Sequence, residues 1–251
     1  HNGHVEKGFK PVHWCPECSS SLAEAEVEYI DKNSTAIDVK FKFDENSTEK
    51  LINKLKLDKK KNISLVIWTT TPWTIPGNQA VCFNADIDYQ VIDSGEEYLL
   101  VAVELCEQCL DRWKNDSYKA TKIKFKGSEL EGLKSLHPLY ERVTPLFVGD
   151  HVTTETGTGF VHTAPAHGVD DFNVCSHENV EVVNPISMNN LYKDDVKFFA
   201  GVHVRKVDPL VLEELKNNEA LICNENYQHS YPHCWRHKTP LIFMATPQWF
   251  I

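Results

Sequence analysis

The stretch GTGFVHTAPAHGVDDF, residues 157–172, joins a short apolar strand pattern, a turn containing Gly and Pro, and a candidate helix start. It places two imidazoles, His162 and His167, and two carboxylates, Asp170 and Asp171, in one neighbourhood. A segment with this much Gly and Pro does not continue as one helix, and polar pockets are commonly built on such loops. The stretch therefore predicts a hydrolytic site where a strand turns into a helix.

A second polar stretch, WTTTPWTIPGNQAV at residues 68–81, supplies three consecutive hydroxyls. Successive strand residues point to opposite faces, and the residue before Pro72 is held extended, so at most two of the three hydroxyls share a face unless the backbone bends. Thr70 and Thr71 are the preferred contacts for a water molecule and an ester. Thr69 is a substrate-binding candidate that β propensity explains as well.

The same stretch contains an amide and two indoles with more than one interpretation. Asn78 could bind a terminal adenosine or the water, although a residue after Gly77 is also typical of a turn. Trp68 and Trp73 could line the pocket, although large aromatic residues at strand ends commonly belong to the core. All three are retained as substrate-binding candidates.

Outside these stretches, short alternating segments predict a mainly β fold with helices. Strands are expected at 36–43, 63–70, 88–92, 97–103 and 121–127. Helices are expected at 48–57, 103–114, 171–179 and 208–217. Many short strands joined by turns favour a closed or nearly closed β-barrel decorated by helices.

Composition and charge limit the classes of function. The chain has 251 residues, and its 41% hydrophobic content supports a buried core. No apolar run approaches the ~20 residues of a membrane-spanning helix, so no membrane partner is expected. With 26 basic and 36 acidic residues the net charge is −10, which argues against an autonomous nucleic-acid binder. Lysine-rich segments at 54–61 and 119–126 are interpreted as solvated faces.

Two cysteine-containing knuckles predict a metal site. Cys15 and Cys18 form a C-x2-C pair, and Cys234 and His237 form a C-x2-H pair near the other end of the chain. Three thiolates and one imidazole would complete a closed, tetrahedral and therefore structural zinc site, provided the two chain ends meet. A degenerate knuckle without metal is the alternative. Eight cysteines without a signal peptide point to a reducing compartment and to metal or core use rather than disulfides, and we expect a cytoplasmic protein.

Four segments together resemble the editing (CP1) domain inserted into the catalytic domain of isoleucyl-tRNA synthetases. They are HWCPECSSSLAEAEVEY, WTTTPWTIPGNQAV, GTGFVHTAPAHGVDDF and YPHCWRHKTPLIFMATPQWF, in the order of that family. Valyl and leucyl relatives carry a TTRP-type first motif and AHD in place of AHG, whereas here Trp73 follows Pro72 and Gly168 follows His167. The HIGH-like and KMSKS-like signatures of the synthetic site are absent.

The resemblance implies a β-barrel editing domain at 31–222, flanked by connecting strands at 1–30 and 223–251 that each carry half of the zinc knuckle. It also implies hydrolysis of valine wrongly esterified to isoleucine tRNA, and of valyl-adenylate. A pocket for isoleucine rejects valine by only about 1–3 kcal/mol, so a second site must remove the smaller amino acid. The implied partners are the 3′ end of that tRNA and the Rossmann catalytic domain of a full-length synthetase.

The resemblance also implies roles for individual residues. Asp171 would hold the substrate ammonium, with Asp170 left to cap the helix. His162 would act as a size gate; the alternative, a general base, would show as lost hydrolysis of valine. The His167 ring could lie in the site or at the surface. With Thr70 and Thr71 as water and ester contacts, no covalent intermediate and no catalytic cofactor are needed.

Two other functions fit the same residues. One is a non-catalytic, zinc-stabilised module that binds the tRNA acceptor end. The other is a valyl-type editing domain that removes threonine.

Overall fold

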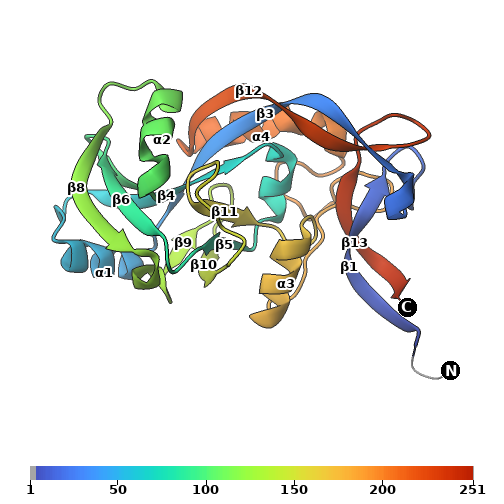
Figure 1. Ribbon diagram of the computed structural model, residues 1–251, viewed down its shortest axis with the longest axis horizontal. Helices are drawn as coiled ribbons and strands as arrows, with labels where there is room; N and C mark the ends of the chain where they lie inside the picture. The colour runs from blue at the N-terminus through green and yellow to red at the C-terminus, as the bar shows by residue number, and fades with distance from the viewer. Residues whose placement is uncertain (1–3, 251) are drawn as a thin grey trace.

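The computed structural model describes residues 4–250, whose strands form three hydrogen-bonded sheets (Figure 1). The three-stranded sheet has the order β13-β1-β2, with bounds Ile242–Phe250, Glu6–Cys15 and Ser20–Ser21. The four-stranded sheet has the order β11-β5-β10-β9, with bounds Phe160–Thr163, Ala80–Phe83, Val143–Val148 and Lys134–Leu136. The six-stranded sheet has the order β12-β3-β4-β7-β6-β8, with bounds Leu221–Cys234, Val27–Lys42, Asn62–Thr69, Glu97–Ala102, Asp88–Asp93 and Lys119–Lys126.

In the described part of the chain, four α-helices and five short 3-10 helices connect these strands. The α-helices are α1 Glu45–Leu55, α2 Cys106–Trp113, α3 Val169–His177 and α4 Asp208–Asn217. The 3-10 helices are η1 Glu24–Glu26, η2 Pro72–Gly77, η3 Val103–Leu105, η4 Gly127–Leu130 and η5 Val204–Lys206. None of the helices within residues 4–250 is long and apolar enough to cross a membrane.

Strand β4 is one of the two central strands of the six-stranded sheet, and the chain continues from it into η2. Its residues Ile63 to Ile67 are all buried, as expected of a strand covered on both faces. It pairs antiparallel with β3 and parallel with β7. A core strand therefore fixes the position from which the chain enters the threonine turn.

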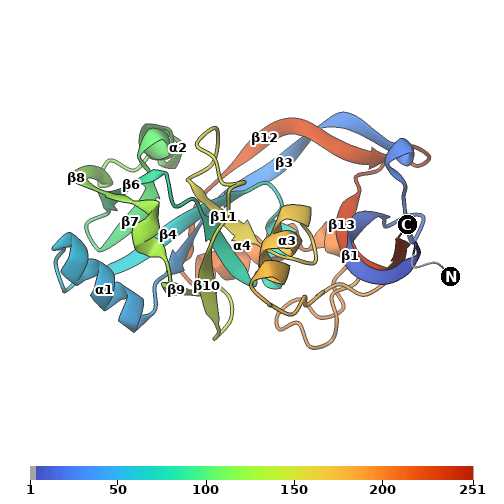
Figure 2. The same cartoon turned by 60° about the horizontal axis from the view of Figure 1, so that its bottom comes forward.

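Strands β3 and β12 form a long antiparallel ribbon that leaves the sheet and reaches β1 and β13 (Figures 1 and 2). Their pairing runs from Val39 opposite Leu221 to Val27 opposite Cys234. Beyond it, β1 and β13 pair antiparallel from Glu6 opposite Phe250 onward. The two ends of the described chain consequently lie side by side, as the two knuckles require.

The predicted mainly β fold with helices is confirmed, but among residues 4–250 hydrogen bonding does not close a barrel. The strands divide into separate sheets of mixed direction. The four predicted helices correspond to α1 to α4 and the five predicted strands to parts of β3, β4, β6, β7 and β8. The proposed domain boundaries, at 30/31 and 222/223, fall inside the continuous strands β3 and β12.

Candidate functional site

The turn between β4 and η2 gathers the hydroxyls of alternate threonines. Thr71 lies just before Pro72 with φ −126° and ψ 69°, outside the helical region that proline disfavours for its predecessor. The backbone N–H of Thr71 donates to Thr69 Oγ1 at 3.1 Å, and the two hydroxyl oxygens are also 3.1 Å apart. Thr74 Oγ1 in η2 lies 3.4 Å from Thr71 Oγ1. Three hydroxyls thus converge at the end of a rigid core strand.

These hydroxyls face β11 and α3 across a cavity of about 210 Å³. Its lining combines both sequence stretches: Trp68, Thr69, Thr71, Thr74, Val161, His162, Ala164, His167 and Asp171. The prediction that residues 68–81 and 157–172 meet is therefore confirmed. The cavity holds hydroxyls, imidazoles and one carboxylate.

The His162 ring is held on both sides and carries no charge. Its Nδ1 lies 2.7 Å from the amide nitrogen of Asn78, and its Nε2 lies 2.9 Å from Thr74 Oγ1. An amide nitrogen donates, so Nδ1 accepts and the ring proton sits on Nε2. Thr74 in turn donates to the carbonyl oxygen of Thr71 at 2.8 Å. Burial lowers the pKa of His162 to about 3, which keeps the ring neutral.

This arrangement leaves His162 without a free lone pair for proton abstraction. Both ring nitrogens are committed to protein partners, and the side chain is 8% exposed. A residue in this state limits the cavity by its bulk. The geometry favours a size gate over a general base.

His167 is buried at the site rather than at the surface. Its Nδ1 donates to the carbonyl oxygen of Phe243 on β13 at 2.9 Å, and Nε2 has no hydrogen-bond partner within residues 4–250. The indole of Trp73 packs against the ring at a T-shaped 5.0 Å. Burial lowers the pKa of His167 to about 4. The neighbouring Ala166 carbonyl accepts the N–H of Ala245, so two bonds join this turn to β13.

Asp171 is the carboxylate of the cavity lining. It lies in the first turn of α3, and its Oδ2 accepts the backbone N–H of Ala164 at 2.8 Å. Burial raises the pKa of Asp171 to about 6, so the group is still largely ionised at neutral pH. A negative charge near a helix N-terminus and among neutral imidazoles suits an ammonium ligand.

The expected cap at Asp170 is wrong. The N-cap position is Gly168, which has no side chain, and exposed Asp170 lies inside the first turn. The helix starts at Val169, two residues earlier than an N-cap at Asp170 requires. The first-turn carboxylate of Asp171 instead holds the preceding turn through Ala164.

Three other predicted site residues lie beside the cavity without lining it. Thr70 is half-buried but falls on the other face of the strand end from Thr69 and Thr71. Asn78 is fully buried behind His162. Trp73 backs His167 and lines a neighbouring cavity. Thr74 lines the site and was not predicted, because it lies in the 3-10 helix η2, which the Gly- and Pro-rich stretch did not predict.

The four predicted metal ligands form one cluster at the far end of the ribbon. The ligand atoms of Cys15, Cys18, Cys234 and His237 lie within 4.8 Å of one another. Cys18 Sγ is 3.8 Å from Cys234 Sγ and 3.3 Å from His237 Nδ1. Zinc–sulfur bonds of about 2.3 Å in a tetrahedron place sulfur atoms about 3.8 Å apart, so the donor set fits a metal ion.

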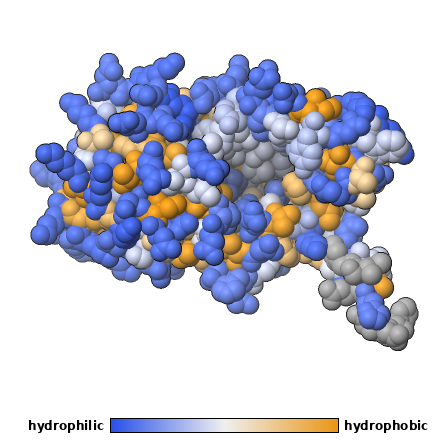
Figure 3. All heavy atoms as spheres, in the orientation of Figure 1, coloured by the Kyte–Doolittle hydropathy of each residue, from blue (hydrophilic) through white to orange (hydrophobic). Residues whose placement is uncertain are grey.

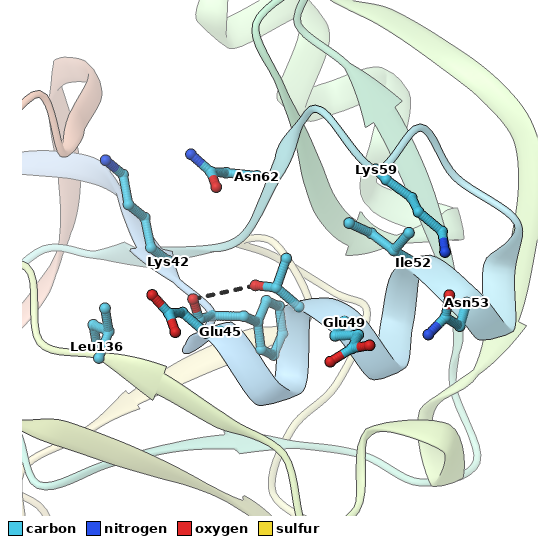
Figure 4. A pocket seen from close by; sticks show the side chains of 10 residues that line it. Lys42, Glu45, Glu49, Ile52, Asn53, Lys59, Asn62 and Leu136 are labelled. Carbon is cyan, nitrogen blue, oxygen red and sulfur yellow. Dashed lines mark hydrogen bonds between the residues drawn. The ribbon is translucent and has the colours of Figure 1, made fainter.

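A larger cavity of about 380 Å³ lies along α1, away from both sequence stretches (Figure 4). Glu45, Glu49 and Asn53 project from the helix, and Lys42 and Lys59 also line the cavity. The lining mixes both signs of charge, mostly on exposed side chains. It contains none of the predicted site residues.

Comparison with known sequences places this geometry in a family. Residues 1–251 match the family of class I tRNA synthetases (I, L, M and V). The chain is 50% identical over 261 residues to the isoleucine–tRNA ligase of Idiomarina loihiensis and 51% identical over 255 residues to that of Colwellia psychrerythraea. Both alignments cover 100% of this chain but only 27% of the relative.

Comparison with solved structures gives the fold independently of sequence identity. The crystal structure of GlLeuRS-CP1 superposes with a TM-score of 0.62 at 13% identity, covering 76% of this chain and 99% of that one. The editing domain of the P. knowlesi cytosolic leucyl-tRNA synthetase superposes with a TM-score of 0.60 at 16% identity, covering 77% and 97%. The fold is that of CP1 editing domains, and the chain belongs to the class I tRNA synthetase family of the isoleucine, leucine, methionine and valine type.

Proposed function

We propose that the chain is the editing segment of an isoleucine–tRNA ligase and hydrolyses valine esterified to isoleucine tRNA, as well as valyl-adenylate. The observation that carries the proposal is the neutral, doubly hydrogen-bonded His162 in the same cavity as the carboxylate of Asp171. The first sets a limit on side-chain size, and the second offers a charge for the amino group. The isoleucine ligases among its relatives favour this cargo.

The proposed reaction needs only the residues of the cavity and a water molecule. Asp171 holds the ammonium and so fixes the ester carbonyl near the hydroxyls of Thr69 and Thr71. A water ordered by these hydroxyls attacks the carbonyl carbon. The bond to the ribose oxygen then breaks and that oxygen takes a proton from the attacking water, which releases valine and the free tRNA end. Positioning an activated ester in this way supplies much of the rate.

The proposed partners are the 3′ end of isoleucine tRNA and the Rossmann catalytic domain of the same synthetase. We place the protein in the cytoplasm. Zinc is the proposed ion for the Cys15, Cys18, Cys234 and His237 cluster, where four protein ligands would leave no open position and give the metal a structural role.

The test is release of amino acid from pre-charged isoleucine tRNA by the full-length synthetase that contains this chain. Valyl, isoleucyl and threonyl esters are compared under the same conditions, with uncatalysed hydrolysis subtracted. Loss of valine in preference to the other two is the expected result. Preferential loss of threonine would select valyl-type editing. Binding of the tRNA with no ester loss would select a non-catalytic acceptor-end module.

A further inference from the structure

A row of aromatic rings runs along one face of β12, starting at the proposed site. Tyr227, His229, Tyr231 and His233 are alternate residues of the strand and therefore share a face. Their successive ring centroids are 5.7, 5.4 and 6.2 Å apart. At the near end, the Tyr227 ring lies 5.0 Å from that of Trp68, which lines the site cavity. We call the first three residues and Trp68 the aromatic row.

The aromatic row leads from the site to a second cavity, of about 250 Å³. Tyr231 lines this second cavity, and so does Trp73, whose ring contacts His167 of the first. Trp68, Tyr227, His229 and Tyr231 are each half-buried, so their rings are not sealed in the core. Figure 3, in the orientation of Figure 1, shows a pale hollow in the middle of this face, beside the β3–β12 ribbon.

The two faces of the ribbon differ in chemistry. Lys32 pairs with His229 and lies over the Tyr231 ring, with Nζ 4.5 Å from the ring centroid. The opposite face carries exposed Gln228 and Ser230, paired with exposed Asn33 and Asp31. Aromatic rings with a cation thus gather on the face that borders both cavities.

The second cavity also offers groups that suit a nucleotide. Arg205 lines it and forms an ion pair with Glu17, while Lys32 supplies a second cation. Asp208 lines it as well, and its Oδ1 has no hydrogen-bond partner within residues 4–250. The amino groups of adenine and cytosine are donors that such a carboxylate can accept.

We propose that the aromatic row and Lys32 bind the unpaired nucleotides that precede the esterified terminal nucleoside of the tRNA. The inference rests on the proposed function for the identity of the strand. Proteins bind single-stranded nucleic acids by stacking bases on aromatic side chains and by placing positive charges near the phosphates. A row that begins at the site cavity guides the strand to the position where its last ribose can enter.

The test measures binding apart from hydrolysis. The ligand is an uncharged, fluorescently labelled hairpin of the acceptor stem with its unpaired 3′ end, and the reference is the same hairpin without that end. In the full-length synthetase, Tyr227→Leu and Tyr231→Leu are each expected to weaken binding of the first hairpin about tenfold and to leave the second unchanged. The ring-preserving Tyr227→Phe and Tyr231→Phe serve as matched controls and should bind within about twofold of the wild type.

Charge is tested with two lysines of the same strand. Lys32→Gln should reduce the dependence of the binding constant on salt, by a log–log slope of about 0.7 for one phosphate contact on a single strand. Lys42→Gln, on β3 but lining the cavity along α1, should leave that slope unchanged.

The outcomes separate this proposal from the proposed function. Weaker hairpin binding by the leucine variants, with no ester hydrolysis by the wild type, would support nucleotide binding by the aromatic row and overturn the proposed hydrolase activity. Ester hydrolysis by the wild type, with equal hairpin binding by all variants, would overturn nucleotide binding by the aromatic row. Equal losses for both hairpins, or in the phenylalanine variants, would also overturn it. A lower melting temperature of the leucine variants without any change in hairpin binding would overturn it as well, because the rings would then serve only packing within the protein.

Discussion

At the scale of single residues, the state of His162 separates two roles that its position alone does not. Its proton is fixed on Nε2 by an amide donor on one side and a hydroxyl acceptor on the other. Its low pKa keeps the ring neutral through the whole physiological range. The neutral ring thus lines the cavity in an orientation that Asn78 and Thr74 fix by hydrogen bonds.

Replacing His162 with alanine should admit isoleucine. The lost ring leaves space for at least one further methylene, so hydrolysis of isoleucyl-tRNA is expected to rise about tenfold or more relative to valyl-tRNA. The measurement is the ratio of kcat/KM for the two esters. His177→Ala, an exposed histidine at the end of α3, is the control and should keep the wild-type ratio. A loss of valine hydrolysis with no gain for isoleucine would point to a base instead.

Asp171 should make hydrolysis depend on pH. Only the ionised carboxylate attracts the ammonium, and the pKa of Asp171 without substrate is about 6. We therefore expect kcat/KM for valyl-tRNA hydrolysis to fall as the pH drops through 6. Asp171→Asn should lose roughly 10- to 100-fold at pH 7.5, the value of a hydrogen bond to a charged group. It should also flatten the acid limb of the profile.

The control for this prediction is Asp170→Asn, an exposed carboxylate in the same helical turn. It should retain both the rate and the acid limb.

The raised pKa of Asp171 also means that its ionisation costs stability above pH 6, and that the cost disappears as the group protonates at lower pH. Asp171→Asn is therefore expected to melt at a higher temperature than the wild type at pH 8 but not at pH 4. If the acid limb of the kcat/KM profile is unchanged in Asp171→Asn, a group other than Asp171 is responsible for it.

At the scale of elements, the loop that precedes β11 depends on a close backbone approach. Gly159 has φ +84°, and a Cβ there would lie 2.4 Å from that of Ala102. Its carbonyl also accepts the hydroxyl proton of buried Tyr89 at 2.7 Å. The start of the strand that carries His162 is therefore pressed against the end of β7.

Gly159→Ala should destabilise the protein by about 2–4 kcal/mol, because it adds overpacking to left-handed backbone strain. Urea unfolding monitored by tryptophan fluorescence gives this free energy. Gly95→Ala is the matched control: it has a similar φ of +92° but open space around the added methyl group, and should cost only about 1–2 kcal/mol. Equal costs for the two variants would show that Ala102 moves aside freely.

The elements were largely predictable from sequence because their signals are local. The apolar alternation of β3, the apolar run of β4 and the residue patterns of α1 to α4 are all contained within the elements that they specify. The grouping of strands into three sheets was not predictable, since pairing such as β11 with β5 depends on contacts far apart in the chain.

The site shows the same division between local and distant information. Period-two alternation places Thr69 with Thr71, and the preference for Thr70 departed from that rule. The role of Asn78 could not be foreseen, because its partner His162 lies 84 residues away. By contrast, the meeting of the two knuckles was foreseen from metal chemistry, which requires distant ligands to converge.

At the scale of the whole molecule, the Cys3His cluster links β1 to the end of β12. We expect one zinc ion per chain by elemental analysis. Its removal by a chelator should lower the melting temperature, because metal binding stabilises the folded state alone. Cys18→Ser should lose the metal and show the lower melting temperature without chelator. Cys223→Ser, outside the cluster, is the control and should retain the ion. Equal metal content in both variants would contradict the assigned ligand set.

The two hydrogen bonds between β13 and the turn at residues 166–167 have a thermodynamic consequence. Phe243 and Ala245 form hydrogen bonds with the turn whose His167 lines the site cavity. The ordering of this turn and the ordering of β13 are therefore thermodynamically coupled. The free energy by which a ligand bound at the turn stabilises the position of β13 therefore equals the free energy by which ordering of β13 favours binding of that ligand.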